Sequence, residues 1–178
     1  CNELKNMNQL DDDLAKTGLP IATYFSLSKI LWLLRNVNDV QQAKLDDDLC
    51  FGTIDSWLIY KFTGNHVTDV TNASRTLLMD LNSLTWLDSV IKILDIPKYA
   101  LPTIKPSLFS YGTNEKILKN VPITAVLGDQ QASLFGHNCI STGDVKNTYG
   151  TGCFALTNTG SEIVNSNNGL LSTVAYQQ

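Results

Sequence analysis

The sequence has 178 residues, of which 43% are hydrophobic, enough to build the core of one domain or of parts of two. The net charge is −4, the pI is near 5.0, and the basic residues form no stripe along the sequence. These features argue against a nucleic-acid partner. Four cysteines without a C-x-x-C pair, and only two histidines, argue against a zinc site. We recognise no secretory signal and no bilayer-spanning apolar run, so we expect a cytoplasmic protein with reduced, buried thiols.

The first part of the chain is predicted to be helical. Residues 1–18 are typical of the end of a polar helix closed by Gly18. An amphipathic helix is expected next, with Ser26 as its N-cap, because apolar residues then recur at the spacing of one helix face. That face consists of Leu27, Ile30, Leu31 and Leu34. Residues 36–39 are predicted to form a turn. Because the chain opens at Cys1, we expect it to be an internal piece of a longer protein.

The middle of the chain is predicted to contain two further helices. The first begins at Thr53 as N-cap and ends at Gly64, and its inward face is expected to carry four apolar residues. These are Ile54, Trp57, Leu58 and Phe62. A polar turn over 71–75 and a short strand over 76–81 follow. A helix over 86–94 is stopped by Pro97, and the proline-rich stretch 97–122 is predicted to be mostly irregular.

The last part of the chain is predicted to alternate strands with one helix. Residues 123–127 form a continuous apolar run, which indicates a strand buried on both faces. A helix over 130–139 follows. Segments 144–148 and 153–158 are expected to pair as a hairpin around a glycine-containing turn. Mixed helices and strands indicate an α/β protein, and the domain boundary is predicted near 137–145.

The chemistry is predicted to centre on Asp129. It directly follows the apolar run and precedes a helix, and α/β folds place ligands at the carboxyl ends of their strands. There the carboxylate could take a proton from a hydroxyl group. An N-cap role is the alternative, and the two roles are compatible.

The turn Tyr149-Gly150-Thr151-Gly152 is the second candidate. Its glycines permit positive φ, and its backbone N–H groups and threonine hydroxyl could approach phosphate oxygens. An ordinary hairpin turn is the alternative. Neither a Walker A loop nor a G-x-G-x-x-G motif is present.

Several motifs occur together in one order along nearly the whole chain. They are Thr17-Gly18-Leu19-Pro20, the segment Tyr24 to Asn36, Phe51 to Leu58, Thr68 to Thr76, Gly128-Asp129-Gln130-Gln131-Ala132 and Asn147 to Phe154. In this combination the chain resembles the FGGY family of carbohydrate kinases, and within it the members that phosphorylate glycerol. The resemblance implies an α/β fold of the actin-like ATPase type, built from ribonuclease-H-like domains. Residues 1–137 would be the later part of the first domain, and 138–178 the start of the second.

The resemblance also implies an activity: ATP-dependent phosphorylation of glycerol to sn-glycerol 3-phosphate, with Mg²⁺. Asp129 matches the general base and lies near the Mg²⁺–nucleotide. Tyr24, Gln130 and Phe154 match residues that bind the polyol together with Asp129. From the residues alone, Tyr24 and Phe154 could equally be core aromatics.

The glycine turn matches the family's phosphate-facing turn, so Gly150, Thr151 and Gly152 are implied to bind ATP. A homo-oligomer is expected for the full-length protein, and the isolated 178 residues are expected to be inactive because half the cleft is missing. The alternatives are a family kinase for another polyol or a ketose, and a non-catalytic member. An ATPase that shares only the fold is a further alternative, against which the Gly-Asp-Gln-Gln motif argues.

Overall fold

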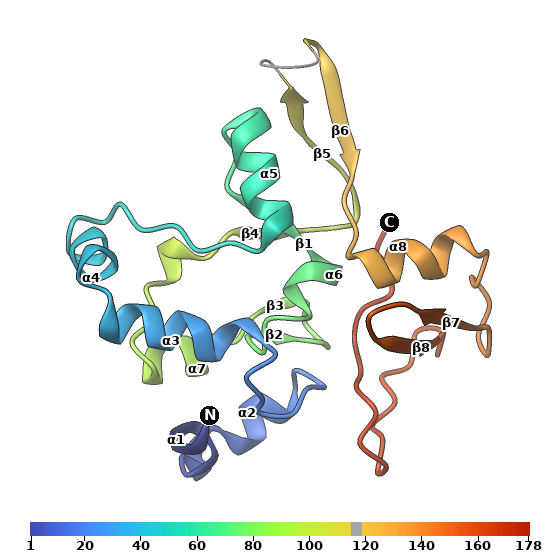
Figure 1. The fold of residues 1–178 in the computed structure, drawn as a ribbon, viewed down its shortest axis with the longest axis horizontal. Helices are drawn as coiled ribbons and strands as arrows, with labels where there is room; N and C mark the ends of the chain where they lie inside the picture. Colours follow the sequence, from blue (N-terminus) through green and yellow to red (C-terminus); the bar gives the residue numbers. More distant parts are fainter. Residues whose placement is uncertain (115–118) are drawn as a thin grey trace.

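The computed structural model describes residues 1–114 and 119–178. Most helices lie on one side of the molecule, the last helix and the last hairpin lie on the opposite side, and another hairpin projects from the top of the view (Figure 1). The helices are α1 (Asn2–Lys5), α2 (Asp11–Ala15), α3 (Ser26–Asn36), α4 (Asn38–Leu45), α5 (Ile54–Thr63), α6 (Val70–Ala73), α7 (Asp88–Ile93) and α8 (Asp129–Gly136), with 3₁₀ turns η1 (Asn8–Leu10) and η2 (Lys98–Ala100). Among the described residues, no helix combines the length and apolar character needed to cross a membrane.

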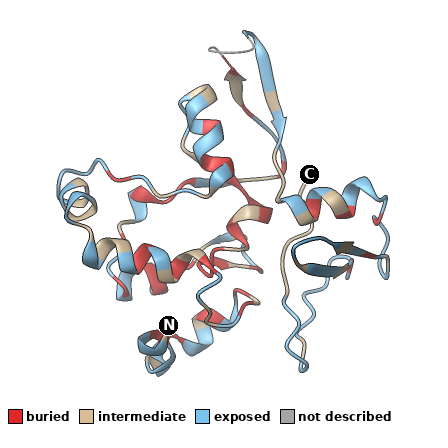
Figure 2. Cartoon of the chain, viewed as in Figure 1, coloured by how far each residue is buried: buried red, intermediate tan, exposed pale blue. Residues whose placement is uncertain are grey.

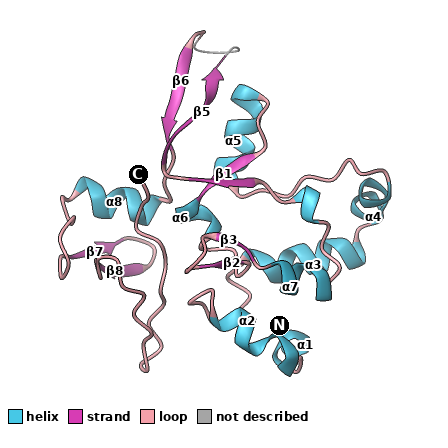
Figure 3. Ribbon diagram, turned by 180° about the vertical axis from the view of Figure 1, so that it is seen from behind, coloured by secondary structure: helices cyan, strands magenta, loops and turns pink. Residues whose placement is uncertain are grey.

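The strands form separate pairs, as the view from behind shows (Figure 3). They are β1 (Val67–Asp69), β2 (Met79–Asp80), β3 (Thr85–Trp86), β4 (Thr103–Lys105), β5 (Leu108–Asn114), β6 (Val121–Ala125), β7 (Val145–Tyr149) and β8 (Cys153–Thr157). β1 pairs with β4 in parallel, whereas β2–β3, β5–β6 and β7–β8 are antiparallel. This mixture of helices and strands confirms the α/β class predicted from the sequence.

The main hydrophobic core lies among the first hundred residues, between α1, α2, α3 and α7. Its members are mostly leucines, and several are completely inaccessible to solvent. They include Leu10, Leu14, Leu27, Leu31, Leu78, Val90 and Ile91. Figure 2 shows the contrast, since buried residues concentrate in this region while the hairpins β5–β6 and β7–β8 are largely exposed.

Three predicted elements are confirmed. α3 buries Leu27, Ile30 and Leu31, as its apolar spacing predicted, although Ser26 is the first helical residue and makes no cap bond. α5 ends at Gly64, whose φ of 80° is the left-handed conformation expected after a helix. β7 and β8 form the predicted hairpin, with Thr148 opposite Phe154.

Several local predictions were wrong. Residues 1–18 break into α1, η1 and α2 because three separate turns each bury one leucine in the core. The turn expected at 36–39 leads into α4, which buries no residue and so gave no periodic signal. The turn expected at 71–75 overlaps α6, which begins at Val70 and is capped by Asp69. The thiols of Cys50 and Cys153 are exposed, and only that of Cys139 is buried.

The stretch 97–127 also differs from prediction. It contains β4, β5 and β6 despite its prolines, because Pro122 lies near the start of β6, where an antiparallel hairpin tolerates it. The apolar run 123–127 is not buried on both faces. It belongs to the exposed hairpin β5–β6 and its continuation, and Ile123 and Ala125 line a cavity instead.

α5 faces the core with its polar side. Ile54, Trp57 and Leu58 are exposed, whereas Asp55, Ser56 and Ile59 are buried. The Asp55 carboxyl accepts hydrogen bonds from the hydroxyls of Thr53 and Thr68. Burial, more than any other influence, raises the pKa of Asp55 above its ordinary value of 3.8.

The raised pKa predicts a pH-dependent effect of Asp55→Asn. The folded protein holds the Asp55 proton more tightly than the unfolded chain, so the wild-type free energy of unfolding falls as pH rises from 3.8 through the raised pKa. An amide has no charged form. We therefore expect the stability of Asp55→Asn relative to wild type to improve between about pH 4 and about pH 7, measured by chemical denaturation. The same stability difference at both pH values would contradict the assignment.

Candidate active site

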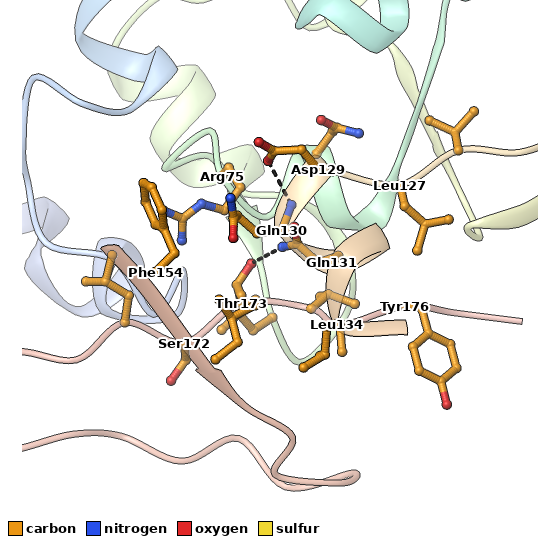
Figure 4. A pocket seen from close by; sticks show the side chains of 18 of the residues that line it. Arg75, Leu127, Asp129, Gln130, Gln131, Leu134, Phe154, Ser172, Thr173 and Tyr176 are labelled. Carbon is orange, nitrogen blue, oxygen red and sulfur yellow. Dashed lines mark hydrogen bonds between the residues drawn. The ribbon is translucent and has the colours of Figure 1, made fainter. Parts of the chain in front are cut away.

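A cavity of about 1960 Å³ opens between α5, α8, β8 and the C-terminal segment. Its walls include four of the residues predicted from the sequence, namely Tyr24, Asp129, Gln130 and Phe154. Figure 4 shows Asp129 and Gln130 at the start of α8, with Phe154 of β8 and Arg75 around the same space. Residues that lie more than a hundred positions apart in the sequence are thus brought to one site.

Asp129 is the first residue of α8 and its side chain is exposed to the cavity. One carboxylate oxygen, Oδ1, accepts the backbone N–H of Gln130 at 2.8 Å. The other oxygen has no partner among the described residues. The structure therefore leaves one oxygen of Asp129 free to accept a proton or a hydrogen bond from a bound molecule.

The start of α8 is held by a buried hydrogen-bond network. Asp69, which is completely inaccessible, accepts bonds from the backbone N–H and hydroxyl of Thr71, the backbone N–H and amide of Asn72, and the hydroxyl of Ser107. The Thr71 hydroxyl in turn accepts the N–H of Gly128 at 2.7 Å. Because Gly128 immediately precedes Asp129, the network fixes the position of the candidate base.

Gly128 packs closely against a buried side chain of α8. A Cβ built on it would lie 2.7 Å from Oε1 of Gln131, a side chain that is 4% exposed. The amide of Gln131 donates to the hydroxyl of Thr173 in the C-terminal segment, at 3.3 Å. Gly128 therefore lets the segment before α8 lie directly against Gln131, which connects this helix to the C-terminal segment.

Tyr24 precedes α3, lines the cavity and is 67% exposed. The guanidinium carbon of Arg75 lies 5.9 Å from the ring centroid of Tyr24 and 5.3 Å from that of Phe25, within cation–π range. Arg75 forms no ion pair with any described residue and lines the cavity. Sequence reasoning did not single out Arg75, although it lies in the motif Thr68 to Thr76, because that segment was assigned to a turn.

Gln130 has a partner that sequence reasoning also missed. Its Oε1 accepts a hydrogen bond from Nζ of Lys146 at 2.7 Å, and Lys146 is 5% exposed. The alternation of β7 could have indicated this burial, since Lys146 and Thr148 occupy the same face of a two-residue period.

The glycine turn lies outside the cavity wall. Gly150, Thr151 and Gly152 do not line the cavity, whereas the next residues, Cys153 and Phe154, do. The N–H of Gly150 donates to the carbonyl of Gly152 at 3.0 Å, and neither glycine has positive φ. A Cβ at Gly152 would lie 3.0 Å from the Phe154 ring. Glycine at position 152 therefore leaves room for the Phe154 ring. The side chain of Thr151 is exposed and has no partner among the described residues.

The described residues contain no cluster of three or more acidic, histidine or cysteine side chains that could hold a metal ion. Asp129 is a single exposed carboxylate. Such a donor suits Mg²⁺ held jointly by one carboxylate, nucleotide phosphates and water, and does not suit a closed protein cage.

The tight contact at Gly128 predicts a difference between two glycine substitutions. Gly128→Ala should destabilise the protein by about 1–3 kcal/mol because the new methyl group must displace Gln131. Gly136→Ala, at the other end of α8, meets nothing within 4 Å and should leave stability unchanged or raise it by up to about 1 kcal/mol. Denaturation of both variants tests this, and equal effects would refute the role of Gly128.

The chain is similar to known kinases along most of its length. Residues 1–136 match the family model described as the N-terminal domain of the FGGY family of carbohydrate kinases. The chain is 48% identical to a glycerol kinase of Roseiflexus sp. (strain RS-1) and 50% identical to one of Chloroflexus aggregans, each over 99% of this chain. It spans 36% of the length of these curated relatives.

Solved structures give the same relationship. The fold is similar to that of Plasmodium falciparum glycerol kinase with ADP, with a TM-score of 0.88 and 43% identity over 93% of this chain and 34% of that one. A gluconate kinase from Lactobacillus acidophilus matches with a TM-score of 0.72 and 26% identity, over 85% of this chain and 32% of the other.

Proposed function

The chain belongs to the FGGY family of carbohydrate kinases, and from this we propose that it forms the acceptor-binding part of an ATP-dependent glycerol kinase that makes sn-glycerol 3-phosphate. Its structural relatives are sugar kinases, which confirms the actin-like ATPase fold expected from the sequence. The observation that carries the proposal is the convergence of Tyr24, Asp129, Gln130 and Phe154 on one cavity. High identity to glycerol kinases along the whole chain supports glycerol as the acceptor.

Asp129 is proposed as the general base. Its free carboxylate oxygen is exposed to the cavity, where it can accept the proton of a terminal hydroxyl as that oxygen attacks phosphorus. Phosphoryl transfer depends mainly on positioning and charge stabilisation, so a base fixed by a buried network suits the reaction. The Asp69–Thr71–Gly128 contacts provide that fixation.

The polyol is proposed to lie between an apolar and a polar wall. The ring of Phe154 offers an apolar surface to the carbon backbone of glycerol, and Gly152 provides the space that this ring needs. Gln130 and Tyr24 offer an amide and a phenol to the hydroxyl groups. A small molecule with one apolar edge and several hydroxyls matches this combination.

The phosphates are proposed to approach the acceptor from the side of the β7–β8 turn. The hydroxyl of Thr151, which has no partner among the described residues, can donate to a phosphate oxygen, and the absence of side chains at Gly150 and Gly152 permits close approach. When bound, Mg²⁺ would neutralise phosphate charge, and the carboxylate of Asp129 would help to hold it. Arg75, which has no carboxylate partner among the described residues, adds positive charge to the cavity wall.

A second candidate function is phosphorylation of another polyol, a ketose or a sugar acid. The observation in its favour is the structural similarity to a gluconate kinase and to a xylulose kinase, each at 26% identity. A panel of acceptors that includes glycerol, gluconate and xylulose would distinguish the two.

The base assignment predicts the effect of Asp129→Asn in the full-length protein. The amide keeps the size and the contact to Gln130 but cannot accept the proton, so kcat for glycerol should fall by about 10²-fold or more while the fold is retained. The measurement is ATP-dependent phosphorylation of glycerol, with circular dichroism to verify folding. Asp12→Asn, at an exposed position of α2, is the matched control and should keep wild-type turnover. Near-normal turnover of Asp129→Asn would refute the base role.

A further inference from the structure

Lys146 is a buried ammonium group without a carboxylate partner. It is 5% exposed, and no described residue forms an ion pair with it. Its Nζ donates to Oε1 of Gln130 at 2.7 Å and to the hydroxyl of Thr148 at 2.6 Å. Burying a charge against neutral acceptors is costly, so this placement of Lys146 indicates a function beyond stability.

The contact with Lys146 determines how the Gln130 amide is oriented. An ammonium group can only donate, so the Gln130 atom facing it must be the carbonyl oxygen, and the NH₂ group must face elsewhere. Gln130 lines the cavity, and its NH₂ has no partner among the described residues. The amide therefore presents hydrogen-bond donors to whatever occupies the cavity.

The same contact connects two elements of the site. Lys146 and Thr148 share one face of β7, and Thr148 lies opposite Phe154 on β8. Gln130 lies on α8, on the other side of the predicted domain boundary near 137–145. The bond from Lys146 to Gln130 thus fixes the amide of one element relative to the aromatic ring of the other.

We propose that Lys146 is a positioning residue for the acceptor: it holds the Gln130 amide so that its NH₂ group donates to a hydroxyl oxygen of the polyol opposite Phe154. This rests on the proposed function, since it assigns a specific task to Gln130 in the same site. Lys146 itself does not touch the acceptor, and it does not line the cavity.

The first test compares KM with kcat in the full-length protein. Lys146→Met keeps the length of the stem but removes the donors, so the Gln130 amide can rotate, and KM for glycerol should rise about tenfold. The kcat should change less than about threefold, because the Asp129 network is untouched. Lys146→Arg, which keeps donors, should recover part of the affinity. Lys92→Met makes the same change at an exposed position of α7 and should leave both constants unchanged.

A double-mutant cycle tests whether Lys146 acts through Gln130. In a Gln130→Ala background, Lys146→Met should raise KM no further, because the side chain that it positions is gone. Additive effects of the two substitutions on KM would overturn the proposal. A fall in kcat with unchanged KM would also overturn it, since Lys146 would then act on the chemical step.

A readout that needs no activity separates failure of this proposal from failure of the proposed function. Gln130→Glu places a carboxylate beside Lys146 and should raise the thermal midpoint, whereas in a Lys146→Met background the same change should lower it. If the protein phosphorylates no glycerol but shows this reversal, the proposed function fails and the contact stands. If the midpoint shifts are equal in both backgrounds, the contact is refuted whatever the substrate.

Discussion

The arrangement of this site depends on a single buried carboxylate, that of Asp69. It is completely inaccessible and accepts bonds from two consecutive backbone N–H groups, which cap α6, and from side chains of Thr71, Asn72 and Ser107. Leaving these donors without an acceptor in the interior would cost about 1–3 kcal/mol for each. The carboxylate therefore holds α6 and the end of β1 in one geometry relative to the segment before β5.

The bonds made by these partners extend the constraint to the cavity. The Thr71 hydroxyl accepts the N–H of Gly128, while Ser107 accepts the N–H of Gln177 through its hydroxyl and that of Val126 through its carbonyl. The chain entering α8 and the C-terminal segment are thus both attached to the residues around Asp69. The proposed phosphoryl transfer would require a precisely placed base, and a chain of buried hydrogen bonds provides such placement better than exposed contacts would.

The sequence predicted the parts of the fold with strong local signals. α3 has one apolar face and β7–β8 has a short turn between alternating strands, and both were predicted within one or two residues. The prediction failed where tertiary contacts outweigh periodicity. α5 turns Asp55 inward because the hydroxyls of Thr53 and Thr68 donate hydrogen bonds to its carboxyl group, and no local sequence pattern predicts such partners.

The motifs identified Asp129, Gln130, Tyr24 and Phe154 as candidates, and the structure places these four around one cavity. The support from Asp69 could not be predicted, because Ser107 and Gly128 are distant from it in the sequence. The alternation of β7 could have indicated that Lys146 is buried, but not that it contacts Gln130.

The most direct test of this account is hydrogen exchange at the Gly128 amide in Asp69→Asn. The substitution keeps the volume but replaces one acceptor oxygen with a donor, so the Thr71 hydroxyl should lose its fixed orientation and no longer hold the Gly128 N–H. We expect exchange at Gly128 to accelerate by at least about tenfold while amides of α3 in the main core keep their protection. Unchanged protection of Gly128 would show that the start of α8 is positioned without Asp69, and would contradict the account.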